Sequence, residues 1–181
     1  MKVTVNVSEK RILKPKEGEY APYAMMYIKL LPDDGRVLEY LNENLKKTKD
    51  LIDSLPVDKL SYRYAEGKWN IKEILLHIID VERIFTYRAL RFARNDKTAL
   101  AGFEQDDYTP HSGANGRNLF SIFEEYEAVR RATVTFFNGC EEEALTRSGL
   151  ANNQNVSVRS LVYQIAGHEL HHCNIIKEKY L

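Results

Sequence analysis

The residues best suited to chemistry are histidines near the end of the sequence. Three of the five histidines, His168, His171 and His172, lie in the segment GHELHHCN. On an α-helix, two side chains four residues apart, such as those of His168 and His172, project from one face about a turn apart. Each imidazole can then give one nitrogen to a shared ion. The pattern predicts a metal site on one face of a helix.

Helical phase distinguishes the three histidines. At about 100° per residue, His168 and His172 lie on one side of the helix. The same side carries Leu161 and Ile165, so we expect these two histidines to face the interior. His171 falls about 100° from His172 and is predicted to be peripheral.

A metal site that keeps one position open normally has three protein ligands, so the pair needs a third. His77 is the best candidate, because it lies on the inner side of a predicted helix in the apolar run EILLHIIDVERIF. Burying three imidazoles without partners would be costly, whereas one cation satisfies all three lone pairs. We therefore favour a site of His77, His168 and His172 over separate, hydrogen-bonded packing histidines. His111 lies in a long loop and is predicted to be exposed.

The residues His168 to His172 also match the HExxH motif of zinc proteases, in which the glutamate is the general base. A third ligand usually lies downstream, but only nine residues follow His172 and none is a histidine or an aspartate. Such a helix also packs beneath a sheet that this sequence does not predict, so we favour the three-histidine site over the protease hypothesis. Glu169 stays a candidate catalytic base, with pairing to a basic neighbour as the structural alternative.

Long helices must position these residues. Apolar side chains recur with the helical period in four segments, around 35–55, 70–94, 118–138 and 157–181. Asn70 is a good N-cap, and Glu73 completes a capping-box pattern with it. The sequence thus predicts an all-α four-helix bundle without a sheet.

The rest of the chain is assigned by its looser patterning. Residues 1–18 are predicted to be an N-terminal arm, with VTVNV alternating like a short strand, and residues 19–181 to be the bundle domain. A short helix is expected within 19–31. Residues 95–117 form a connection of a length that is typical of a functional or disordered loop.

Composition excludes several classes of partner. The 26 lysines and arginines balance 26 aspartates and glutamates, whereas a general nucleic-acid binder needs a basic patch. No stretch approaches the ~20 apolar residues of a membrane span, and the N-terminus lacks the apolar core of a secretory signal. Cys140 and Cys173 are predicted to be packing residues, with a reactive thiol as the alternative. We expect a cytoplasmic protein with a small-molecule substrate and no nucleic-acid or membrane partner.

With these residues in view, the sequence resembles the DinB-like, or YfiT-type, superfamily of small metal-binding four-helix proteins. The resemblance is carried by GKWNIKEILLHIIDVERIFTYRALRFAR, GFEQDDY, FEEYEAVRRATVTFF and SVRSLVYQIAGHELHHCNII, in this order. It implies an up-down-down-up bundle, a zinc or nickel site at one end, and a homodimer. Matched by motif, His77 is the ligand from helix two, and His168 and His172 are the pair from helix four.

The resemblance leaves the activity between alternatives. One is a metal-dependent, hydrolase-like enzyme whose mononuclear three-histidine site activates water or a thiol. Another is an S-transferase that uses a low-molecular-weight cellular thiol, and a third is a non-catalytic metal-binding stress protein. A structural zinc site normally has four protein ligands, so three favour an enzyme.

Several other residues have open roles at this point. Asp80 and Glu82 could orient an imidazole, with ion pairing as the favoured structural alternative. Trp69 is predicted to anchor the start of its helix. The segment from Gly102 to Tyr108 is expected at the mouth of the pocket, where Tyr108 or Arg117 could contact substrate.

Overall fold

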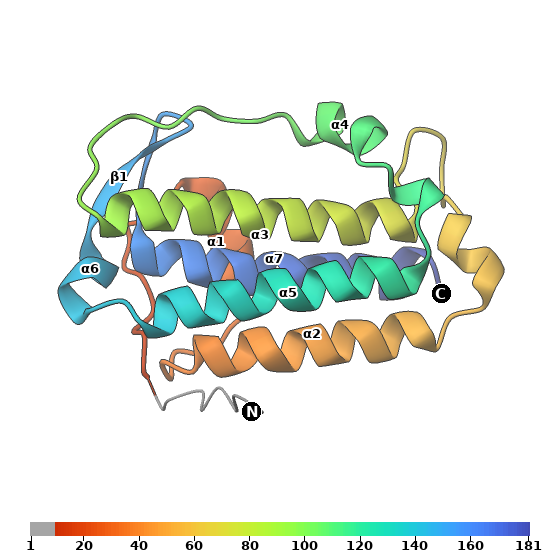
Figure 1. Cartoon of the computed structure of the whole chain (residues 1–181), viewed down its shortest axis with the longest axis horizontal. Coiled ribbons are helices and arrows are strands. Elements are labelled where there is room, and N and C mark those ends of the chain that lie inside the picture. The colour runs from red at the N-terminus through yellow and green to blue at the C-terminus, as the bar shows by residue number, and fades with distance from the viewer. Residues whose placement is uncertain (1–9) are drawn as a thin grey trace.

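The computed structural model describes residues 10–181, and four long helices form its body (Figure 1). They are α2 (Val37–Asp53), α3 (Ile71–Ala93), α5 (Leu119–Asn138) and α7 (Val158–Lys179). Asn70, Asn118 and Ser157 cap the last three, because each side chain accepts a hydrogen bond from the backbone N–H three residues on. The predicted all-α four-helix bundle is confirmed. No helix in the described part of the chain is long and apolar enough to cross a membrane.

The helices have the up-down-down-up order that the resemblance implied. Figure 1 shows α2 and α7 running in one direction and α3 and α5 in the other. Both α2 and α3 pack against α5 and α7. Because α3 and α5 are parallel, the chain between them must return along the bundle. Residues 94–118 do so beside α3 and form the short helix α4 (Gln105–Tyr108) on the way.

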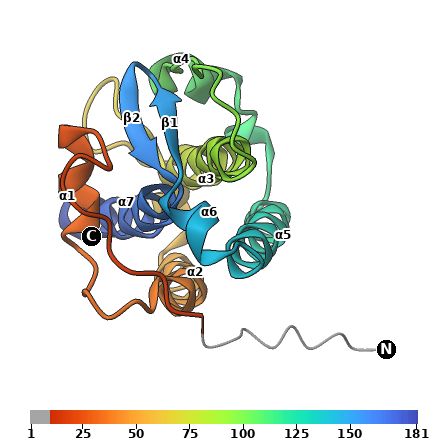
Figure 2. The ribbon, with the colours of Figure 1, turned by 90° about the vertical axis from the view of Figure 1, so that its left-hand side faces the viewer.

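The prediction that the chain contains no sheet was wrong for the segment between α5 and α7. After the short helix α6 (Glu142–Thr146), strands β1 (Ser148–Ala151) and β2 (Gln154–Ser157) pair in an antiparallel hairpin (Figure 2). Its two turn residues, Asn152 and Asn153, have φ values of 49° and 58°. Asparagine tolerates this left-handed conformation, which a two-residue type I′ turn requires at both central positions.

The short helix predicted within 19–31 is confirmed as α1 (Met25–Ile28), which packs on α7. The approach is close enough that a Cβ on Gly167 would overlap the carbonyl of Tyr27, so glycine is required immediately before His168. Residues 1–9, which include the strand-like VTVNV, lie outside the described residues. Ile12, within the predicted arm, is fully buried in the core.

A buried ionic cluster joins all four long helices. Arg130 Nη2 of α5 lies 2.9 Å from Glu82 Oε2 of α3 and 2.8 Å from Glu169 Oε2 of α7. Its Nη1 donates to the carbonyl of Leu41 on α2, and Thr48 Oγ1 donates to Glu169 Oε1 at 2.7 Å. The side chains of Arg130, Glu82 and Glu169 are at most 1% exposed. The cluster therefore fixes the helices relative to one another through charge-assisted hydrogen bonds.

Candidate metal centre

Three histidines from two helices converge inside the bundle. His168 Nε2 of α7 lies 3.0 Å from His77 Nε2 of α3 and 3.0 Å from His172 Nε2 of α7. One ring nitrogen of each histidine lies within 4.8 Å of a ring nitrogen of the other two. Among the described residues, these three side chains form the one cluster of possible ligands that could hold a metal ion. The structure thus brings together the three histidines that helical phase selected. His171 does not belong to the group and packs its ring on Tyr27 instead.

The donor set fits a divalent metal ion. Nitrogens about 2.1 Å from a tetrahedral ion lie about 3.4 Å apart. The two separations of 3.0 Å from His168 Nε2 are close to this value, and all three nitrogens lie within 4.8 Å of one another. Burial lowers the pKa of His77 to about 4, and burial together with the other histidines lowers that of His172 to about 3. The pKa of His168 is also lowered, chiefly by burial. All three rings are therefore neutral at pH 7, which is the form that binds a metal. A proton on His168 Nε2 can form a hydrogen bond with only one of the two nitrogens that face it, those of His77 and His172. A shared cation, in contrast, binds the lone pairs of all three nitrogens.

Aromatic side chains hold these rings in place. The centroid of the Trp69 ring lies 4.7 Å from that of His77 and 6.5 Å from that of His172. Tyr27 packs edge-on against His168 at 5.3 Å. Trp69 precedes the N-cap of α3, as predicted, and in addition forms a wall of the site. Rings restrained on several sides keep their nitrogens aimed at one point.

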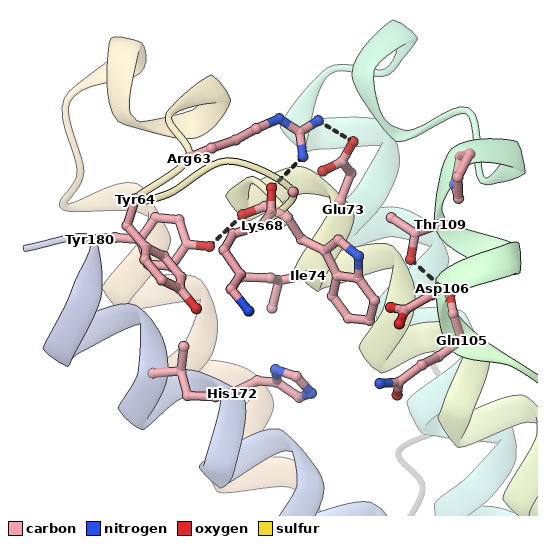
Figure 3. A pocket seen from close by; sticks show the side chains of 14 residues that line it. Arg63, Tyr64, Lys68, Glu73, Ile74, Gln105, Asp106, Thr109, His172 and Tyr180 are labelled. Carbon is pink, nitrogen blue, oxygen red and sulfur yellow. Dashed lines mark hydrogen bonds and ion pairs between the residues drawn. The ribbon is translucent and has the colours of Figure 1, made fainter.

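A cavity of about 800 Å³ opens beside the cluster and reaches His172. Figure 3 shows His172 on one side of this cavity, with Arg63 and Glu73 across from it and Gln105 and Asp106 on a neighbouring wall. Arg63 donates to Glu73 at 2.6 Å and to the carbonyl of Lys68 at 2.6 Å, which fixes the loop before α3. The cavity is large enough for a small-molecule ligand.

Comparison with known proteins agrees with this architecture. The family model of the DinB superfamily matches residues 40–176, which include all three histidines. The chain belongs to the DinB superfamily. A relative from Oceanobacillus iheyensis, named as a candidate metal-dependent hydrolase, is 28% identical over 158 residues, covering 82% of this chain and 90% of the relative.

The fold of this DinB-superfamily protein also matches a solved structure. YfiT from Bacillus subtilis, described as a probable metal-dependent hydrolase with an unusual four-helix bundle topology, superposes with a TM-score of 0.72. The match covers 91% of this chain and 90% of YfiT at 13% identity, so it shows the shared fold. Together with the histidine cluster, the Oceanobacillus iheyensis relative indicates a DinB-superfamily protein that binds a divalent metal ion.

The structure does not bring Glu169 to the three histidines. Both of its carboxylate oxygens are bonded within the ionic cluster, to Thr48 and to Arg130, and the side chain is fully buried. A carboxylate held in this way has no free oxygen for proton transfer at the cavity. Helical phase alone could not identify the partner of Glu169, because Arg130 lies on another helix. Pairing to a basic residue, the structural alternative, is what the structure shows.

The other residues with open roles lie away from the cluster. Glu82 forms the buried ion pair with Arg130. Asp80, Tyr108 and Arg117 line a separate cavity of about 550 Å³ together with His111. Arg117 donates to Ser121 and pairs with Glu125, so it stabilises the start of α5.

Two further predictions concern the long loop and the cysteines. Gln105 and Asp106, within the predicted segment Gly102 to Tyr108, line the cavity at His172. Cys140 and Cys173 are both buried and free, and burial raises the pKa of Cys173 to about 11. A thiol with such a pKa stays protonated at neutral pH, which favours the packing role for Cys173.

The lowered histidine pKa values predict metal binding that tolerates acid. Free imidazole loses its ligand form below its ordinary pKa of about 6.5, whereas the rings of His77 and His172 stay neutral until the pH approaches 4. Zinc affinity, measured by chelator competition, should therefore change little between pH 7 and 5.5. A tenfold loss between pH 7 and 6 would contradict this expectation.

The same shifts predict how the metal-free protein responds to pH. Above pH 6.5 the rings are neutral in both the folded and the unfolded chain. Between about 6.5 and 4 the unfolded chain binds protons that the folded chain does not, so the free energy of unfolding should fall as the pH falls. Urea unfolding of the metal-free protein at several pH values measures this effect.

Proposed function

We propose that this protein is a metal-dependent hydrolase of a small-molecule substrate, with His77, His168 and His172 holding one zinc or nickel ion. The observation that carries the proposal is the convergence of three neutral imidazole nitrogens beside a cavity that reaches His172. Three protein ligands leave a position open, which is the arrangement of catalytic zinc sites. When bound there, a divalent ion would lower the pKa of water or polarise a carbonyl.

The chain itself supplies position and charge around the ion. Trp69 and Tyr27 restrain the rings of the three ligands. Because these ligands are neutral and Glu169 is bonded elsewhere, they leave the charge of a divalent ion uncompensated. The site should therefore favour substrates with an anionic or strongly polar group. Lys68, which lines the same cavity as His172, adds a positive charge to its wall.

The test is hydrolysis of small chromogenic esters and amides by the zinc-loaded protein. We expect turnover that a chelator abolishes and that His77→Ala removes. His171→Ala is the control, since this histidine lies on α7 with two of the proposed ligands but outside the cluster, and it should keep activity within about threefold of wild type.

Each reaction is run with and without added cysteine as a thiol. Turnover without the thiol supports hydrolysis. Turnover that requires the thiol would contradict hydrolysis and identify a thiol S-transferase instead. No metal-dependent turnover under either condition would contradict a catalytic role. The homodimer and the cytoplasmic location stay predictions from the resemblance and from the sequence.

A further inference from the structure

Arg88 of α3 is a buried cation without a carboxylate partner. The residue is 6% exposed, and no acidic group of residues 10–181 forms a salt bridge with it. Its Nη2 donates to the carbonyl of Ala101 at 2.9 Å, and its guanidinium lies 5.6 Å from the Phe85 ring and 5.8 Å from the Phe103 ring. The other buried arginine of the bundle, Arg130, has two carboxylates. A buried charge is costly unless it is paired, so Arg88 is placed to receive an anion.

The unbonded N–H groups of Arg88 face a cavity. Every fully enclosed side-chain nitrogen or oxygen in the described chain has a hydrogen-bond partner. The Nε and Nη1 atoms of Arg88 have no partner among the described residues, so they are not fully enclosed. Arg88 lines a cavity of about 280 Å³ together with Phe85 and Phe103, the two rings nearest its guanidinium. Burial lowers the pKa of Arg88 from its ordinary value, yet a guanidinium stays protonated at neutral pH.

This cavity connects Arg88 to the metal centre. His168 lines it as well, and Gln105 and Asp106 line both this cavity and the larger one at His172. On α3, His77 is followed by Val81, Phe85 and Arg88 at steps of four, four and three residues, which keeps all four on one helix face. Val81 and Phe85 form the apolar floor between the two ends. A ligand in this cavity would have the Arg88 cation at one end and His168, one member of the histidine cluster, at the other.

The lining favours a carboxylate over a phosphate. Arg88 is the one basic side chain, apart from the neutral His168, among the residues that line the cavity, and Glu104 and Asp106 line it too. These carboxylates repel a dianionic phosphate more strongly than a monoanionic carboxylate, and one guanidinium matches one carboxylate in a bidentate pair. At about 30 Å³ per water molecule the cavity holds the volume of about nine waters, which suits a small acid.

We propose that Arg88 binds the carboxylate group of a small acidic substrate whose other end reaches the three histidines. The role as substrate rests on the proposed function, whereas carboxylate binding at Arg88 does not. Arg88 is then the residue that selects acids among possible substrates. The hairpin contributes to the same cavity through Asn152, which lines it together with Phe103.

Butyrate titration of the metal-free protein, followed by amide chemical shifts, tests the proposal without any need for activity. Removing the metal excludes carboxylate binding at the ion. We expect Arg88→Met to raise the Kd for butyrate by about tenfold or more, as for the loss of a charge-assisted hydrogen bond. Arg91→Met is the matched control, because Arg91 lies on the same helix and pairs with Asp96 near the surface. It should leave the Kd unchanged, and an Arg88→Met value within twofold of wild type would overturn the proposal.

Two measurements on the wild-type protein keep the test decisive if Arg88→Met does not fold. Protons of bound butyrate should show nuclear Overhauser contacts with the rings of Phe85 and Phe103, and their absence at saturation would overturn the proposal. Inorganic phosphate should bind more weakly than butyrate, and equal binding would contradict carboxylate selection. A failure of the hydrolase assay would leave these results unaffected, so the two proposals fail separately.

Discussion

Replacing His168 with alanine should abolish tight metal binding. His168 Nε2 is the central donor, 3.0 Å from the ligand nitrogens of both His77 and His172. Its loss leaves two imidazoles, and even residues that only support a ligand contribute 10- to 100-fold to metal affinity. We expect zinc affinity to fall by more than about 100-fold in a competition assay with a chromophoric chelator.

His171→Ala provides the comparison for this prediction. It removes an imidazole from the same turn of α7 that packs against His172 but gives no nitrogen to the cluster. Its metal affinity should stay within about threefold of wild type. Equal affinity of His168→Ala and wild type would show that the metal binds elsewhere.

Replacing Arg130 with methionine should produce the largest loss of stability in the bundle. The substitution leaves Glu82 and Glu169, both fully buried, without their shared cation. Removing one partner of a buried ion pair typically costs about 3–5 kcal/mol, because the remaining charge is uncompensated. We therefore expect the free energy of unfolding, measured in urea, to fall by at least about 3 kcal/mol.

Two variants show whether the buried charges cause this loss. Arg83→Met removes an arginine of α3 whose side chain is 47% exposed and pairs with Glu125, so it should cost at most about 1 kcal/mol. Changing Glu82 and Glu169 to leucine in the Arg130→Met background removes the orphaned carboxylates and should recover part of the stability. An Arg130→Met protein within about 1 kcal/mol of wild type would contradict the structural role of the cluster.

The helices and the histidine cluster were predictable because their signals are local. The 3.6-residue period marked the four long helices, and Asn70 with Glu73 marked the start of α3. The spacing of His168 and His172 placed two rings on one face of a single helix. His77 required one more step, from the apolar run around it to the shared interior.

The remaining features depend on residues that are distant in sequence. Glu169 could not be assigned to the ionic cluster, because Arg130 reaches it from α5, 39 residues away. Arg88 gave no signal, since an arginine on a helix is usually exposed and only the fold shows that it lacks a carboxylate. The hairpin had a local signal in Asn152 and Asn153, but two four-residue strands are too short to show a clear alternation.

X-ray absorption spectroscopy of the zinc-loaded protein tests the central claim most directly. The account predicts one zinc ion with three imidazole nitrogens at about 2.0–2.1 Å and one exchangeable oxygen or nitrogen ligand. The His77→Ala protein should lose this signature, and His171→Ala should keep it. Sulfur at about 2.3 Å, or fewer than three imidazoles in the wild-type protein, would contradict the three-histidine site.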